Sequence, residues 1–139
     1  MSRDSSVSVA VYKTKWFARF ARKARIDDKT LLKAALAADA GFVDADLGSG
    51  IIKQRVARRG EGKSGGSRTF IVIRRHDRAV YVFGFEKEDQ ANIGPDEWKP
   101  LKKLAEEILN YSAADIAENI KAGELISIAG VEDKNGDEI

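Results

Sequence analysis

The 139-residue sequence contains no cysteine, a single histidine and two prolines. Without cysteine the chain has no disulfides, no thiol catalysis and no cysteine-ligated zinc, and His76 alone cannot form a histidine-rich metal site or a two-histidine acid/base pair. No run approaches the roughly 20 apolar residues of a membrane helix. The polar residues 2–6 do not provide the apolar region of a signal peptide. We therefore expect a cytoplasmic protein without a metal or cofactor.

The composition is that of a folded protein, with 43% hydrophobic and 33% charged residues. Because domains cluster at roughly 100 to 150 residues, the length predicts a single domain over residues 1–139. Residues 1–6 and 130–139 are polar enough to be flexible tails.

The net charge of +2 conceals a strong asymmetry along the chain. Residues 1–90 hold 19 Lys and Arg against 11 Asp and Glu, whereas residues 91–139 hold 5 against 11. Between residues 51 and 78 nine cations face only Glu61 and Asp77. Such a concentration attracts polyanions, so nucleic acid is favoured over the alternative, a solvated charged face.

The first third of the chain predicts a strand followed by a helical hairpin. Apolar residues alternate over residues 7–12, as in a strand with one buried face. Apolar residues at helical spacing then predict a basic helix capped by Thr14, and a second helix that begins at Asp27 and ends at Gly41. Residues 41–50 are expected to form a loop.

The middle of the chain predicts an antiparallel meander of three strands, at residues 51–57, 68–74 and 79–85. The near-continuous apolar character of the last two indicates central strands, covered on one face by the helices.

Two more helices are predicted after the meander, giving an α+β fold. The third covers residues 98–109, and Pro100 indicates either an irregular first turn or a start near that residue; the fourth runs from Ser112 to Gly123. Residues 125–128 are expected to form a short strand or a docked tail.

The segment Gly62-Lys63-Ser64 is similar to the end of a nucleotide-binding P-loop. The required earlier glycine is Ala57 here, and a strand-like segment follows where a helix is needed, so ATP or GTP binding is rejected. A glycine-rich hairpin loop remains as the structural alternative. The basic loop residues Arg58, Arg59 and Lys63, together with Arg74, are candidates to bind an RNA backbone.

Four cations are predicted to converge in the meander. Lys53 and Arg55 share one strand face, Arg68 begins the neighbouring strand, and Lys87 follows the last strand. Such a cluster suits cleavage of a phosphodiester, because arginine stabilises the charge of a phosphorane and a lysine with a depressed pKa can activate a 2′-hydroxyl. Cations that merely keep an exposed sheet face soluble are the alternative.

The single histidine and the aromatic residues are predicted to have structural rather than catalytic or base-binding roles. His76 is placed in the surface turn at residues 75–78, at the opposite end of the meander from Arg68. The alternating Tyr81, Phe83 and Phe85 are placed on one face of their strand, as core residues rather than a base-stacking platform. Trp16 and Trp98 are likewise expected to pack.

Three segments resemble the RelE/ParE superfamily of bacterial toxin-antitoxin toxins. They are KSGGSRTF at residues 63–70, FGFEK at residues 83–87 and ANI at residues 91–93. The order of strand, two helices and three-stranded meander agrees, and the Lys-Ser-Gly-Gly-x-Arg segment is most similar to the RelE-like branch. The similarity extends from about residue 7 to residue 126.

This resemblance implies a ribosome-dependent, metal-independent mRNA endoribonuclease that inhibits translation and is held inactive by an antitoxin protein. Arg68 matches the arginine expected to stabilise the transition-state phosphate. Lys53 and Arg55 match two strand lysines, one of them a proposed base, and Lys87 matches a lysine after the last core strand. The implied partners are the antitoxin, mRNA and the ribosome, with no nucleotide cofactor.

Two alternatives to an active ribonuclease stay open at the level of sequence. One is a noncatalytic ParE-like inhibitor of DNA gyrase, and the other is an RNA-binding domain that has lost catalysis. The arginine that the resemblance expects after Lys87 is Glu88, and Tyr111 does not match the C-terminal tyrosine of RelE toxins.

Overall fold

The computed structural model describes residues 9–57, 66–86 and 95–128. They form a six-stranded sheet in the order β2-β3-β4-β5-β1-β6, in which all neighbours are antiparallel except the parallel pair β1 and β5. The strands are β1 Ala10–Thr14, β2 Ala45–Gly48, β3 Ile51–Val56, β4 Ser67–Arg74, β5 Arg78–Glu86 and β6 Leu125–Ser127. The predicted α+β class and the meander β3-β4-β5 are confirmed, and residues 125–128 include a short strand. The predicted tails lie outside the described residues.

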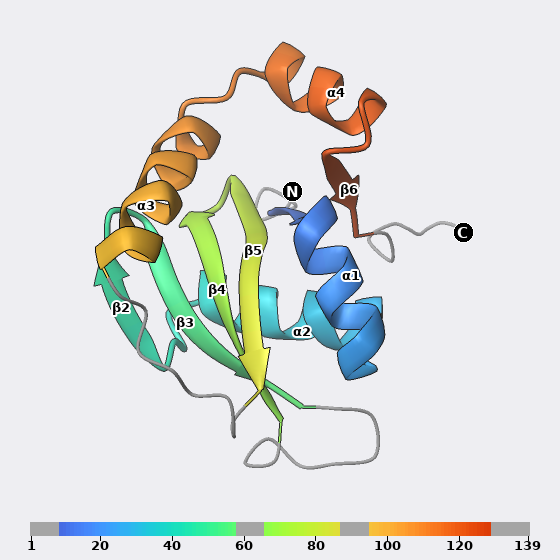
Figure 1. The fold of residues 1–139 in the computed structure, drawn as a ribbon, viewed down its shortest axis with the longest axis vertical. Coiled ribbons are helices and arrows are strands. Elements are labelled where there is room, and N and C mark those ends of the chain that lie inside the picture. The colour runs from blue at the N-terminus through green and yellow to red at the C-terminus, as the bar shows by residue number, and fades with distance from the viewer. Residues whose placement is uncertain (1–8, 58–65, 87–94, 129–139) are drawn as a thin grey trace, which may run out of the picture.

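Four helices complete the fold: α1 Lys15–Ala24, α2 Asp28–Asp39, α3 Pro95–Leu109 and α4 Ala113–Lys121. The side chains of Thr14 and Asp27 cap α1 and α2 as predicted, and Ser112 forms a capping box with Asp115 at α4. In Figure 1, α3 and α1 lie on opposite sides of β4 and β5, and α4 lies between α3 and β6.

Two predicted boundaries are wrong. Residues 41–50 were expected to form a loop, but they include β2, whose sequence ADLG has weak strand propensity and which forms because Ala45 and Asp46 pair with β3. Helix α3 begins at Pro95, before the predicted start at residue 98 or near Pro100. A proline at the first helical position loses no hydrogen bond, and the helix continues through Pro100.

The sheet is covered on both faces. One core contains residues of α1 and α2, such as Phe17 and Leu31, packed with Ile71. The other contains Ala105 and Ile108 of α3, packed with Val72 and Val80. Strands β4 and β5 are therefore central, as predicted, but α3 covers a second face that the prediction did not include.

The prediction that Tyr81, Phe83 and Phe85 share one face is wrong. Phe70 pairs with Phe83 while the next residue, Ile71, pairs with Tyr81, so Val82 is an extra residue in β5. A β-bulge of this kind reverses the alternation of side chains. Tyr81 therefore belongs to the core under α1 and α2, whereas Phe83 and Phe85 pack on the α3 side.

Tyr81 connects the sheet to α2 through a buried hydrogen bond. Its hydroxyl donates to the carbonyl oxygen of Leu31 at 2.8 Å, and its side chain is fully buried against Phe17. Burial raises the pKa of Tyr81 above its ordinary value, because a phenolate would lie in an apolar core.

We predict that Tyr81→Phe lowers the free energy of unfolding at pH 7 by about 1 kcal/mol, the usual net value of one hydrogen bond. Tyr81 also makes stability pH-dependent: above pH ~10 the unfolded tyrosine ionises while the folded one stays neutral, so stability falls by up to ~1.4 kcal/mol per pH unit. The variant should show a shallower decline than the wild type between pH 10 and 11. Urea unfolding at both pH values measures this, and equal declines would refute it.

Candidate functional site

The register of the meander brings three of the predicted site residues together. Arg55 of β3 is paired with Arg68 of β4, which is itself paired with Phe85 of β5. Two residues earlier in β3, on the same face, Lys53 is paired with Phe70 of β4, which is paired with Phe83 of β5. Both rows lie on the α3 side of the sheet, because their neighbours Ile51, Val72 and Val80 pack in the α3 core. We call Lys53, Arg55 and Arg68 the cation row.

The cation row is accessible and only lightly neutralised. Arg55 is exposed, Lys53 and Arg68 are half-buried, and the Nε atom of Arg55 lies 3.8 Å from Asp44 Oδ2. The Nη1 atom of Arg68 donates to the carbonyl oxygen of Gly66 at 3.4 Å. In the described part of the chain, neither Lys53 nor Arg68 forms an ion pair. These cations can therefore accept an external anion.

The segment before β2 holds the backbone of β3 at Arg55 through hydrogen bonds. Asp44 Oδ2 accepts a hydrogen bond from the backbone N–H of Arg55 at 2.6 Å. Buried Gln54 donates to the carbonyl oxygens of Phe42 and Ala34 at 2.8 and 3.3 Å, and its Oε1 accepts from the Asp44 backbone N–H at 3.1 Å. Gln54 thus fixes the backbone on which Asp44 and Arg55 meet.

Four other predicted site residues, Arg58, Arg59, Lys63 and Lys87, lie outside the described residues. Lys87 directly follows Glu86, the last residue of β5. Glu86 pairs with Ser67, the residue before Arg68. The P-loop alternative stays rejected, because residues 67–74 form the strand β4 rather than a helix.

Arg74 is not brought together with the cation row. It ends β4, six residues from Arg68, a distance of about 20 Å along a strand. Its guanidinium donates to the carbonyl oxygen of Leu109 at 2.9 Å and pairs with Asp77 at 3.0 Å. This contact anchors the end of α3, and RNA binding by Arg74 stays a prediction.

His76 and Tyr111 also lie at that remote end. His76 is in the turn between β4 and β5, as predicted, where its backbone N–H and imidazole contact Asp39. The carbonyl oxygen of Tyr111 accepts a hydrogen bond from Arg78, the first residue of β5. Arg68 is paired with Phe85 near the other end of β5, and about 23 Å of strand separates Phe85 from Arg78. Tyr111 therefore does not reach the cation row.

Two further cations, which the sequence analysis did not predict, share a cleft with Arg55 on the other face of the sheet. Lys29 and Lys33 of α2 line a cleft of about 430 Å³ together with Arg55, Gln54 and Val56. Like charges four residues apart are mildly unfavourable on a helix, and that spacing was the available signal. The cleft opens on the α2 side of β3, and Arg55 is the member of the cation row that lines it.

A family model described as the RelE toxin of the RelE/RelB toxin-antitoxin system matches residues 9–128. The chain belongs to the RelE toxin family. It is thus the toxin component of a toxin-antitoxin system and has an antitoxin as a partner. The search of curated proteins finds no match.

In this RelE-family toxin, no helix of the described residues has the length and apolar character needed to cross a membrane. The family match also covers α3, α4 and the whole of β6, so these elements belong to the matched toxin region.

We predict that Gln54→Leu destabilises the toxin by about 2 kcal/mol, because it leaves buried carbonyl groups without donors at similar side-chain volume. The matched control is Lys53→Leu, the preceding residue on the opposite face of β3, which should change stability by less than about 0.5 kcal/mol. Urea unfolding measures both. Equal losses in the two variants would contradict the supporting role of Gln54.

Proposed function

We propose that this toxin is a ribosome-dependent mRNA endoribonuclease that works without a metal ion and inhibits translation. The observation that carries the proposal is the pairing of Arg55 with Arg68, with Lys53 on the same face. Two neighbouring guanidinium groups offer forked donors to a phosphodiester. Because its substrate is mRNA under translation, the proposal places the toxin in the cytoplasm.

The proposed reaction transfers the phosphoryl group within the RNA. A base removes the proton of the 2′-hydroxyl, and the 2′-oxygen attacks the adjacent phosphorus. The bond from phosphorus to the 5′-oxygen breaks, and that oxygen takes a proton. The products are a 2′,3′-cyclic phosphate and a free 5′-hydroxyl.

Each residue of the cation row receives one role. Lys53 is the candidate base, since arginine stays protonated and cannot remove a proton. Arg68 stabilises the charge of the phosphorane, and Arg55 binds the phosphate from the neighbouring strand. Lys87, which the resemblance matches to a lysine after the last core strand, is assigned here as the donor of the proton to the 5′-oxygen. Lys29 and Lys33 extend the path of the RNA backbone beyond Arg55.

A catalytically inactive RNA-binding domain is the second candidate function. Glu88 replaces an expected arginine, and Tyr111 lies at the far end of β5 from Arg68. An inactive domain would keep RNA affinity through the same cations but would leave RNA intact.

We predict that inducible expression of the toxin in a bacterial host arrests growth and produces new in-frame mRNA 5′ ends. Arg68→Ala should reduce this cleavage about 100-fold or more, the usual cost of removing one transition-state donor. Growth curves and mapping of 5′ ends from the same culture measure both effects.

The matched control is Arg22→Ala, an exposed arginine of α1 that does not belong to the cation row, which should cleave like the wild type. Growth arrest without cuts would indicate a protein target such as gyrase. Cuts that persist in Arg68→Ala would remove Arg68 from the chemistry.

A further inference from the structure

A path of aromatic side chains leads from the cation row to helix α1. Phe85 is paired with Arg68, its ring centroid lies 6.3 Å from that of Phe83, and Phe83 stacks on Trp16 at 4.8 Å. The sequence predicts that Trp16 packs, and one contact does hold it against Phe83, but the residue remains 44% exposed. The exposed end of the path is therefore a surface on which another planar group can stack.

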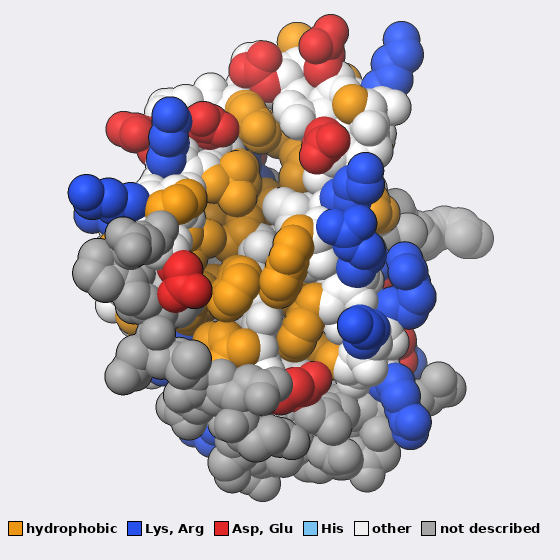
Figure 2. All heavy atoms as spheres, viewed as in Figure 1, with side chains coloured by type: hydrophobic (Ala, Val, Ile, Leu, Met, Phe, Trp, Pro, Cys, Tyr) orange, Lys and Arg blue, Asp and Glu red, His pale blue; other side chains and the backbone are white. Residues whose placement is uncertain are grey.

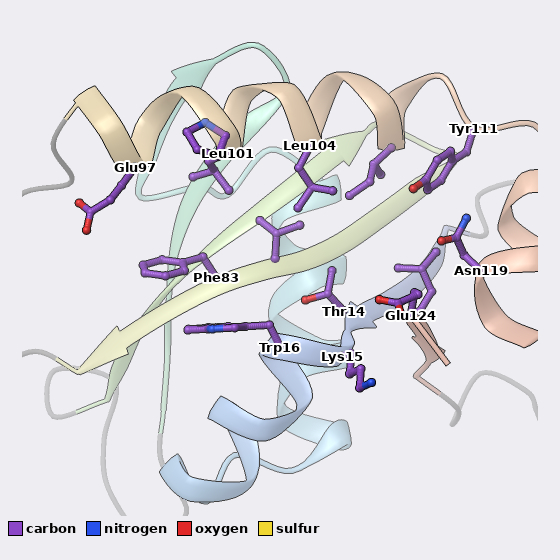
Figure 3. A pocket seen from close by; sticks show the side chains of 14 residues that line it. Thr14, Lys15, Trp16, Phe83, Glu97, Leu101, Leu104, Tyr111, Asn119 and Glu124 are labelled. Carbon is purple, nitrogen blue, oxygen red and sulfur yellow. The ribbon is translucent and has the colours of Figure 1, made fainter. Parts of the chain in front are cut away.

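Trp16 lines two concavities of different character. One is an apolar groove of about 480 Å³ between α1 and α3, which we call the α1–α3 groove; it has Phe83 at its base. Figure 2 shows this apolar patch with basic side chains along one edge, and Figure 3 shows Leu101 and Leu104 pointing into the groove opposite Trp16. The other, which we call the α1 cleft, measures about 500 Å³ and is lined by Trp16, Arg19, Phe20, Arg22 and Lys23.

Trp16 is held in this position by regular structure. Strand β1 pairs with β5 only as far as Tyr81, after which the chain enters α1, and α1 packs against the part of β5 that β1 leaves uncovered. Gly84 permits this close packing, since a Cβ atom there would lie 2.4 Å from the ring of Phe20. Because Trp16 lies in the first turn of a packed helix, its ring is preorganised for a ligand.

Two cations of the α1 cleft share the face of α1 that carries Trp16. Arg19 and Lys23 follow Trp16 by three and seven residues, a spacing that places side chains on one side of a helix. Arg22 also lines the cleft, but its offset of six residues turns it by about 120° from Trp16 around the helix axis. Helix α1 contains no acidic residue, and within the described part of the chain neither Arg19 nor Lys23 forms an ion pair. Both can therefore bind phosphate groups.

Acidic side chains gather at the other end of the α1–α3 groove. Figure 2 shows them beyond one end of the apolar patch. At that end the pKa of Tyr111 is raised, first by burial and then by carboxylates, among them that of Glu107. Glu97 lines the groove from α3, on the wall opposite Trp16. A polyanion is consequently attracted to the α1 side and repelled from the Tyr111 end.

An exposed aromatic ring beside unpaired cations is the usual arrangement in sites for single-stranded nucleic acid, where bases stack and the backbone is neutralised. Paired bases are already stacked within a duplex, so such a site favours an unpaired nucleotide. Phe83 lies two residues, about 7 Å, along β5 from the neighbour of Arg68, and Trp16 stacks directly on Phe83. A single strand with a phosphate at Arg68 can therefore place a nearby base at Trp16.

We propose that Trp16, Arg19 and Lys23 form a second RNA subsite, in which Trp16 stacks an unpaired base of the strand that is cut and the two cations bind its backbone. The identity of that strand rests on the proposed function. The subsite positions the strand over the cation row and so contributes to the choice of the phosphate that faces Arg68.

The first test follows the fluorescence of Trp16 in the variant Trp98→Phe, which leaves Trp16 as the only tryptophan. The probe is a short single-stranded RNA of mixed sequence with 2′-O-methyl groups, which cannot be cut because its 2′-oxygens are blocked. Its binding, followed by anisotropy, should quench the fluorescence, since a stacked base quenches an indole. The same RNA annealed into a duplex should quench much less when equally bound. Equal quenching by both forms, or none by the bound single strand, would overturn the stacking.

The second test compares affinities for the same probe. Trp16→Ala should bind about tenfold more weakly, within the usual effect of losing one stacked base, and Trp16→Phe, which keeps a ring, should lose less. Arg19→Ala leaves the stacked rings in place; it should weaken binding several-fold and reduce the slope of log affinity against log salt by about one. The matched control is Arg22→Ala, the same charge change on the same helix, which should bind like the wild type.

Wild-type affinity in both Trp16→Ala and Arg19→Ala would overturn the inference. Equal losses in Arg19→Ala and Arg22→Ala would also overturn it, because they would indicate general attraction to a charged helix. Unchanged RNA affinity in Trp16→Ala with weaker binding of the antitoxin would make Trp16 a protein contact instead.

Failure of the subsite and failure of the proposed function are distinguishable, because the probe is bound without ribosomes and without cleavage. If the wild type cuts no mRNA on ribosomes but the expected differences in affinity are found, the proposed function fails and the subsite stands. If the wild type cuts mRNA while Trp16→Ala keeps its RNA affinity, the subsite fails and the proposed function stands.

Discussion

The antiparallel register between β3 and β4 is the constraint on which the rest of the site depends. It pairs Arg55 with Arg68 and sets Lys53 beside Phe70, so cations and aromatic side chains emerge on one face. A shift by one residue would bury these cations and expose Ile52 and Val56. The hydrophobic core therefore enforces the arrangement that the proposed chemistry requires, and Gln54 secures it at the edge where β2 joins.

A second constraint is the local irregularity of β5. The extra residue Val82 directs Tyr81 into one core and Phe83 into the other, at the point where β1 ends and α1 begins. The same short stretch thus anchors α2 through Tyr81 and forms the base of the α1–α3 groove through Phe83. The cation row and the groove are consequently neighbours on one continuous face of the toxin.

Much of this fold could be predicted from the sequence. Three helix caps, the meander and the shared face of Lys53 and Arg55 follow from local patterns, because caps and alternation depend on neighbouring residues. Strand β2 could not be predicted, since it forms only through pairing with β3. The bulge at Val82 was equally hidden, because it depends on which residues of β4 and β5 pair and not on the composition of β5.

The candidate site was partly predictable for the same reason. Lys53, Arg55 and Arg68 lie together because strand pairing is regular, whereas Arg74 is separated from them by the length of β4. Lys29 and Lys33 were missed because their proximity to Arg55 arises from the packing of α2 on β3, which no local pattern encodes. The capping of α3 by Arg74 and Arg78 could not be predicted either, because it joins segments that are distant in the sequence.

The most direct test of the ribonuclease assignment is chemical identification of the RNA ends made by purified toxin on ribosomes that carry a defined mRNA. Transfer of the phosphoryl group by the 2′-oxygen predicts a 2′,3′-cyclic phosphate on one fragment and a 5′-hydroxyl on the other. These ends should form with the wild type and be lost in Arg68→Ala. Intact mRNA with the wild type, or fragments with 5′-phosphate ends, would contradict the assignment of the cation row as the active site.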